Sequence, residues 1–191
     1  MNRATHRRRH RRRHRRDDHD VTVETRDRPS ALRSGFTTFS PQFAGRPLRA
    51  YHLEAATAIL ARTEGAMGKT FVVIMARQMG KNELSAHLEA WLLDQASETG
   101  GTIVTAAPTL RPQLHVSLAR LSGVLRRPRY EGTVQRAHGS TLPVGNAEAT
   151  FLSASPTAHA AGMTESHLLE IDEGKDVDFD KYPPATFARW Q

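Results

Sequence analysis

Hydrophobic and polar positions follow two different periods in the first half of the chain. Over residues 47–59, apolar side chains recur at helical spacing, which predicts an amphipathic helix of about four turns. Phe71–Met75 is almost wholly apolar and rich in β-branched residues, a pattern typical of a buried parallel strand. The helical period returns over residues 82–97, and the glycine pair at 100–101 indicates where that helix ends.

Shorter apolar runs follow in the second half of the chain. They predict a strand over 102–106, a helix over 114–125, β-like pieces over 133–136, 141–144 and 149–152, and a last strand over 167–171. Alternation of strands with helices is typical of an α/β fold whose parallel sheet is covered on both faces. We therefore expect a parallel sheet sandwiched by helices.

Positive charge is concentrated at the N-terminus. The chain has 191 residues and a net charge of +7, and residues 1–20 carry nine Arg against three Asp. Six of the seven net positive charges thus lie in this segment, which excludes a uniformly basic nucleic-acid-binding domain. A charged run without apolar residues cannot offset its ordering entropy. We expect residues 1–46 to be a disordered basic tail and linker, and residues 47–191 to be the globular domain.

Composition excludes several classes of function. The chain has no Cys, so it can form neither a disulfide framework nor a thiolate zinc site, and it has no Cys nucleophile. No apolar run approaches the ~20 residues of a membrane span. The N-terminus lacks the apolar stretch of a secretory signal. These features lead us to expect a cytoplasmic protein without a membrane partner.

A candidate phosphate-binding loop follows the predicted strand Phe71–Met75. Residues 76–83 read ARQMGKNE and place Gly80 and Lys81 directly before the next predicted helix. This order of strand, loop and helix aims the unpaired N–H groups of a helix N-terminus at a bound anion. The loop departs from the usual pattern at Met75, which replaces a Gly, and at Asn82, which replaces the magnesium-binding hydroxyl.

A second Gly-Lys pair lies earlier in the chain. Gly68-Lys69-Thr70 has the favourable residue types, but it follows a predicted helix and precedes a predicted strand. Because this order is the reverse of the one that a phosphate cradle requires, we interpret residues 64–70 as a turn.

An acidic pair ends the last predicted strand. Asp172 and Glu173 follow a largely apolar run that is interrupted only by Glu170. In P-loop ATPases an Asp at this position holds magnesium and the adjacent Glu polarises the attacking water. Taken alone, the pair is equally compatible with a charged strand end. Together with the loop before residue 82, in this order and at this separation, it predicts a P-loop NTPase-like core that hydrolyses nucleotides.

Over residues 46–185 the chain resembles the ATPase domain of the tailed-phage terminase large subunit, a DNA-packaging motor. Arg77-Gln78-Met79-Gly80-Lys81 fits the family's form of the loop, and Pro47–Glu54 is similar to its adenine-recognition segment, with His52 in place of the usual Gln. Three further segments are similar in order: Thr105–Thr109, Ala161–Thr164 and Glu173–Val177.

The resemblance implies ATP and Mg²⁺ as ligands and assigns roles to single residues. The catalytic residues would be Lys81 at the β/γ-phosphates, Arg77 at the γ-phosphate and Glu173 as activator of water. Asp172 and Asn82 would hold Mg²⁺. The remaining nucleotide-binding residues would be Gln78, Met79 and Gly80 in the loop, with Tyr51 stacking on the adenine and His52 beside it.

The resemblance also implies partners and a setting. The partners would be double-stranded DNA, the terminase small subunit and the portal protein, in the cytoplasm of a bacterial host of a phage or prophage. In this family a nuclease domain follows the ATPase domain. Only 18 residues follow Glu173, so we expect a sheet that is truncated on its C-terminal side, and no nuclease domain.

Three alternatives remain open from the sequence. The chain could be a degenerate, non-enzymatic remnant of such an ATPase. It could be a basic-tailed module that binds nucleic acid through phosphate charge. It could also be a fragment of a superfamily 2 helicase, which shares the strand-end acids and an adenine-binding segment.

Overall fold

The computed structural model describes residues 35–41, 46–63, 70–135, 138–155 and 167–177. The arginine-rich segment, Lys69 and the segment Ala161–Thr164 lie outside the described residues. Among the described residues, no helix combines the length and the apolar character that crossing a membrane requires.

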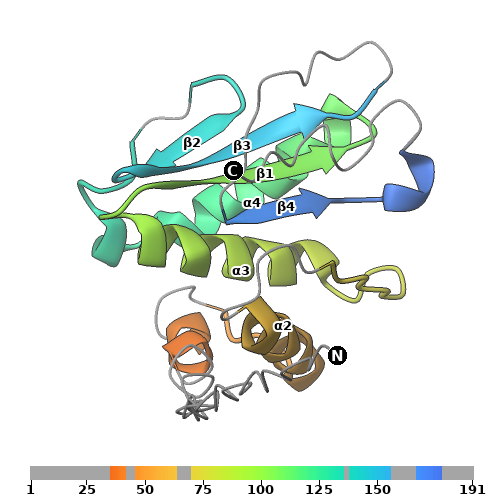
Figure 1. The fold of residues 1–191 in the computed structure, drawn as a ribbon, viewed down its shortest axis with the longest axis horizontal. Helices are drawn as coiled ribbons and strands as arrows, with labels where there is room; N and C mark the ends of the chain where they lie inside the picture. Colours follow the sequence, from red (N-terminus) through yellow and green to blue (C-terminus); the bar gives the residue numbers. More distant parts are fainter. Residues whose placement is uncertain (1–34, 42–45, 64–69, 136–137, 156–166, 178–191) are drawn as a thin grey trace, which may run out of the picture.

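A four-stranded sheet forms the centre of the described fold (Figure 1). Its strands are β1 (Gly101–Ala107), β2 (Thr141–Val144), β3 (Ala147–Ser153) and β4 (Leu168–Ile171), in the spatial order β2-β3-β1-β4. β1 pairs in parallel with β3 on one side and with β4 on the other, whereas β2 and β3 form an antiparallel hairpin. The chain therefore has an α/β fold with a mixed, mostly parallel sheet.

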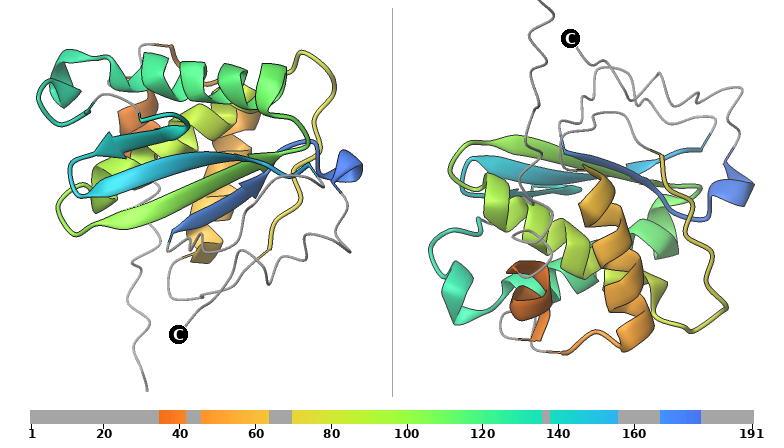
Figure 2. Two further views of the ribbon diagram at one scale, coloured as in Figure 1. Left: turned by 90° about the horizontal axis from the view of Figure 1, so that it is seen from above. Right: turned by 60° about the horizontal axis from the view of Figure 1, so that its bottom comes forward.

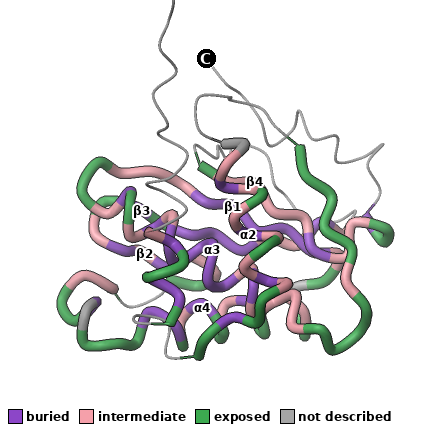
Figure 3. Tube along the Cα trace, turned by 90° about the horizontal axis from the view of Figure 1, so that it is seen from below, coloured by how far each residue is buried: buried purple, intermediate pink, exposed green. Residues whose placement is uncertain are grey.

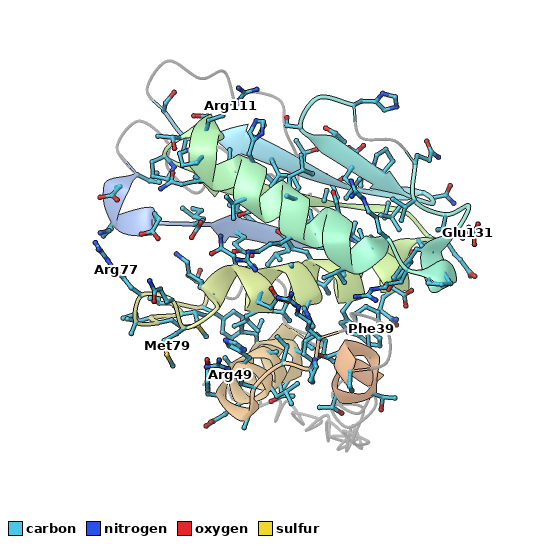
Figure 4. All side chains as sticks on the ribbon, turned by 180° about the vertical axis from the view of Figure 1, so that it is seen from behind. Phe39, Arg49, Arg77, Met79, Arg111 and Glu131 are labelled. Atoms are coloured by element: carbon cyan, nitrogen blue, oxygen red, sulfur yellow. The ribbon has the colours of Figure 1, made fainter. Side chains whose placement is uncertain are left out.

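Three long helices accompany the sheet. They are α2 (Ala50–Thr63), α3 (Lys81–Ala96) and α4 (His115–Leu125), close to the predicted ranges, and short helical turns cover Leu110–Leu114, Pro128–Tyr130 and Gly174–Asp176. Seen from behind, α3 and α4 both lie in front of the strands (Figure 4). The sequence predicts helices on both faces of the sheet, but in the described part α3 and α4 lie on the same face of it.

α3 separates the sheet from a further helical layer. Figures 1 and 2 show α2 and a short helix over residues 35–41 on the side of α3 that faces away from the strands. The inner strand β1, which lies between β3 and β4, is buried from Ile103 to Ala107 (Figure 3). The largest fully buried apolar side chains of the described core are Phe36, Phe39, Leu60, Leu93, Ile103, Leu114, Leu121, Leu125 and Phe151.

The short helix over residues 35–41 falls within the range expected to be a linker. Phe36 and Phe39 are 0% and 1% exposed, and both rings pack edge-on against Trp91 of α3. Ser40 Oγ and His87 Nδ1 are hydrogen-bonded at 3.0 Å. The folded part therefore begins before Pro47. Two aromatic residues within a turn-rich stretch carry too little periodicity to predict this helix, because its stability comes from contacts with α3.

Phe71–Met75 differs more sharply from its prediction as a buried strand. The segment is not a strand and pairs with none of the four strands of the described sheet. Val72 is 81% exposed and Ile74 is 90% exposed. β-branched residues favour extended backbone, but a strand also needs a neighbouring strand to which it can hydrogen-bond. Local sequence does not specify that neighbour.

Candidate functional site

The loop before α3 is shaped by two residues with left-handed backbone. Gln78 has φ 63° and Gly80 has φ 86°, on either side of Met79. The Gly80 carbonyl accepts hydrogen bonds from the N–H groups of Glu83 and Leu84 at 3.0 and 3.1 Å. Gly80 is thus the N-cap residue of α3.

Three consecutive N–H groups at this helix end are free donors as far as the described residues go. Those of Gly80, Lys81 and Asn82 have no hydrogen-bond acceptor within the described part of the chain, as is usual for the first turn of a helix. The Met79 N–H, in contrast, donates to the Ala76 carbonyl at 3.2 Å. The backbone donors available to an anion are therefore those of residues 80–82, and the N–H of Met79, which the resemblance places in the nucleotide site, is not among them.

Lys81 connects the loop to the acidic pair after β4. Its Nζ lies 2.5 Å from Asp172 Oδ1 and 2.9 Å from Glu173 Oε1. The Glu173 N–H donates to Asp172 Oδ1 at 3.0 Å, and Glu173 has a left-handed φ of 52°. The Asp172 N–H donates to the Ala106 carbonyl, which anchors the turn to β1. Two motifs predicted separately, 92 residues apart, thus meet at one place.

Lys81 and Glu173 each stabilise the charged form of the other. Burial disfavours the charged Lys81 ammonium, but hydrogen bonds and attraction from Asp172 and Glu173 outweigh it and raise the pKa of Lys81. The hydrogen bond and charge of Lys81, with smaller contributions from Lys175 and Arg77, lower the pKa of Glu173. Figure 4 shows Arg77 extending from the loop toward the turn after β4. Lys81 and Glu173 are therefore both charged at neutral pH.

Two further carboxyl groups lie between α3 and the sheet. Ser85 Oγ donates to Glu170 Oε1 at 2.5 Å, and Thr105 Oγ1 donates to Glu89 Oε1 at 2.5 Å. Burial, together with neighbouring carboxylates, raises the pKa of both Glu89 and Glu170. Glu170 thus has a partner on α3, which accounts for a charged residue inside this strand. Glu89 was not predicted, because a single Glu within an apolar helix gives no signal of its partner.

Tyr51 and His52 contact the loop from the first turn of α2. The Tyr51 hydroxyl donates to the Met79 carbonyl at 2.9 Å, and His52 Nε2 donates to the same oxygen at 2.7 Å. The His52 side chain is only 4% exposed. Tyr51 also lines an open pocket of about 500 Å³ between α2 and residues 71–76, with Ala55, Ala58 and Ile59 among the other lining residues.

The remaining predicted site residues lie on or next to the loop but make fewer contacts with the acidic pair. Arg77 and Gln78 are exposed on the loop. No polar contact between Asn82 and Asp172 occurs among the described residues, although Asn82 directly follows Lys81. The described segments also hold no cluster of three or more His, Asp or Glu side chains able to bind a metal ion. Mg²⁺ does not need such a cluster, since one or two carboxylates with water and phosphate oxygens suffice.

Comparison with known proteins provides no relative for this arrangement. The chain matches no family model, and neither a curated protein nor a solved structure is significantly similar to it.

Proposed function

We propose that this protein binds ATP with Mg²⁺ and hydrolyses it, as the motor domain of a terminase large subunit of the tailed-phage type. The observation that carries the proposal is the contact of Lys81 with Asp172 and Glu173. Ion pairs between a surface lysine and an acidic residue are common, but this one joins the N-terminus of a helix to the end of a parallel strand. A phosphate loop and a magnesium-binding strand end must meet in space, because both act on the same phosphates.

Phosphate binding would fall to the first turn of α3. The free N–H groups of residues 80–82 and the positive end of the helix dipole favour an anion at this position. Lys81 adds a full positive charge that can neutralise the β- and γ-phosphates. The exposed Arg77 guanidinium, on the same loop, can add a second charge at the γ-phosphate.

The acidic residues fit a magnesium-dependent reaction. Asp172 presents a largely buried carboxylate at the end of β4, and Asn82 can supply an amide oxygen from α3. When bound, Mg²⁺ would neutralise charge that develops on the phosphates. Glu173, whose pKa is lowered by Lys81, is ionised at neutral pH and can accept a hydrogen bond from the attacking water and orient it.

The pocket beside Tyr51 is the proposed place for the base. Its lining is mainly apolar, and it lies between α2 and the segment that leads into the phosphate loop. A planar base can stack on an aromatic ring in such a setting. His52 does not line this pocket, so a direct contact of His52 with adenine has no support.

The partners proposed for the motor are double-stranded DNA, the terminase small subunit and the portal protein, in the cytoplasm of a bacterial host. The support for DNA is the nine-Arg segment at the N-terminus, which can contact phosphates without reading sequence. The two protein partners rest on the family resemblance alone.

The two Gly-Lys pairs provide a matched test. Lys81→Ala is expected to abolish binding of a fluorescent ATP analogue, because Lys81 is the cation of the loop. Lys69→Ala is expected to leave binding unchanged. Equilibrium titration of the full chain in the presence of Mg²⁺ measures both. Loss of binding in Lys69→Ala with retention in Lys81→Ala would reverse the assignment.

A degenerate protein that binds nucleotide without hydrolysing it is the second candidate. Phe71–Met75 lies outside the sheet, so the loop lacks the firm base that a paired strand provides. Single-turnover hydrolysis of ATP separates the two candidates. Hydrolysis that is lost in Glu173→Gln while binding is retained supports the motor. Binding without hydrolysis in the unmodified chain supports the degenerate protein.

A further inference from the structure

Two neighbouring side chains of α2 bind a single backbone oxygen of the phosphate loop. The Tyr51 hydroxyl and His52 Nε2 both donate to the Met79 carbonyl, at 2.9 and 2.7 Å. A carbonyl oxygen is only an acceptor, so His52 carries a hydrogen on Nε2. A carbonyl oxygen has two lone pairs, and here both are used by residues adjacent in the sequence.

This carbonyl belongs to the peptide that starts the anion-binding turn. In a planar trans peptide the C=O and N–H bonds point in opposite directions. Holding the Met79 carbonyl toward α2 therefore directs the Gly80 N–H away from α2, and this N–H is the first of the three free donors.

The His52 ring also packs against the Gly80 end of this peptide. A Cβ atom on Gly80 would lie 2.9 Å from His52 Cε1, so the imidazole ring packs directly against the Gly80 backbone. The flanking residues Gln78 and Gly80 both have left-handed backbone. For Gln78 that conformation is intrinsically unfavourable, so outside contacts are needed to maintain the turn.

We propose that Tyr51 and His52 are positioning residues that orient the Met79–Gly80 peptide for phosphate binding. The inference rests on the proposed function, since it concerns the same phosphate site. It assigns His52 to the loop rather than to the base. The ring is almost fully buried and its Nε2–H is already used by Met79. Tyr51 acts on the loop through its hydroxyl, while its ring lines the pocket.

Three variants separate the roles of donor and ring. Tyr51→Phe removes only the hydroxyl, His52→Gln keeps an N–H donor, and His52→Leu removes the donor. Thr57→Val is the matched control, because the Thr57 hydroxyl bonds to the Leu53 carbonyl within α2 itself. Equilibrium binding of three probes to the full chain in Mg²⁺ is measured: ATP, inorganic triphosphate and adenosine.

We expect Tyr51→Phe to weaken binding of ATP and of triphosphate equally, by about 2- to 10-fold, the worth of one hydrogen bond. His52→Leu should weaken both by at least as much, and His52→Gln should restore part of the loss. Adenosine binding should not change in His52→Leu, and Thr57→Val should bind all three probes normally.

The outcomes distinguish this inference from the function on which it rests. Unchanged triphosphate binding in Tyr51→Phe and His52→Leu overturns the positioning role while the ATP site stands. Weaker adenosine binding with normal triphosphate binding in His52→Leu overturns it in favour of a base contact. If the unmodified chain binds neither ATP nor triphosphate, the proposed function fails and the inference falls with it.

Discussion

Gly80 is restricted to glycine for two independent reasons. Its φ of 86° lies in the left-handed region, which costs other residues about 1–2 kcal/mol. Its Cα also faces the His52 ring so closely that an added Cβ would lie 2.9 Å from Cε1. The N-cap residue of α3 is therefore restricted both by backbone conformation and by packing against α2.

We predict that Gly80→Ala destabilises the protein by about 1–3 kcal/mol, because it adds left-handed strain and a clash. Gly123→Ala is the matched control. Gly123 lies inside α4, where an added Cβ would meet no neighbouring side chain or segment within 4 Å, and Ala in a helix interior is favoured over Gly by about 1 kcal/mol. Urea unfolding of the two variants should show changes of opposite sign.

The buried carboxyl group of Glu89 makes the stability of the folded protein depend on pH. Burial, followed by the charge of Glu170, raises its pKa in the folded protein above the ordinary 4.5. The folded protein thus holds this proton more tightly than the unfolded chain does. The resulting stabilisation is complete below pH 4.5 and is lost as the pH rises through the folded pKa.

Glu89→Gln should therefore equal the unmodified protein in stability below pH 4.5 and exceed it at neutral pH, because the amide keeps an acceptor for Thr105 without a charge. Each unit of pKa shift corresponds to about 1.4 kcal/mol. Unfolding free energies measured across this pH range check it, with the exposed Glu98→Gln as control. Equal stability of Glu89→Gln and the unmodified protein at every pH would contradict the assignment.

At the scale of elements, α3 connects most parts of the described fold. Its N-terminus directly follows the candidate phosphate-binding loop, Ser85 bonds to β4, Glu89 bonds to β1, and Trp91 packs against the helix over residues 35–41. Nine of its 16 residues are buried. Packing on several sides explains why its sequence is less clearly amphipathic than that of a surface helix.

The attachment of the helix over residues 35–41 can be tested through Phe39. Phe39→Ala should destabilise the protein by about 3–5 kcal/mol, since it removes a fully buried ring that packs on Trp91. Thr38→Ala, at an exposed neighbouring position, should stay within about 0.5 kcal/mol of the unmodified protein. A loss below about 1 kcal/mol for Phe39→Ala would mean that this helix is not part of the core.

For the whole molecule, the net charge is distributed unevenly along the sequence. Six of the seven net positive charges belong to residues 1–20, whereas the candidate site lies where α3 meets the end of β4. Nucleotide binding and DNA binding should therefore be separable properties of the chain.

We predict that deleting residues 1–20 removes most of the affinity for double-stranded DNA. Each phosphate contacted by an arginine contributes about −0.9 to the slope of log K against log salt concentration, so the slope should also become shallower. Binding titrations at several salt concentrations measure both effects. Lys81→Ala, with the N-terminal segment intact, is the control and should bind DNA normally. Unchanged DNA affinity after the deletion would refute the role of this segment.

Local sequence determined the elements whose patterns depend on near neighbours. The helices over 47–59, 82–97 and 114–125, and the pieces that became β1, β2, β3 and β4, follow from side-chain period and from the Gly and Pro residues that bound them. The order of motifs also identified Lys81, Asp172 and Glu173 as one candidate site.

Only the tertiary structure decided which distant groups become partners. It placed β1 between β3 and β4, left Phe71–Met75 unpaired with any strand of the described sheet, and set Ser85 against Glu170. It also turned His52 toward the Met79 carbonyl. The physical reason is common to these cases: period and turn residues act over a few positions. A hydrogen bond between segments far apart in the chain depends on how the whole sheet and its helices pack.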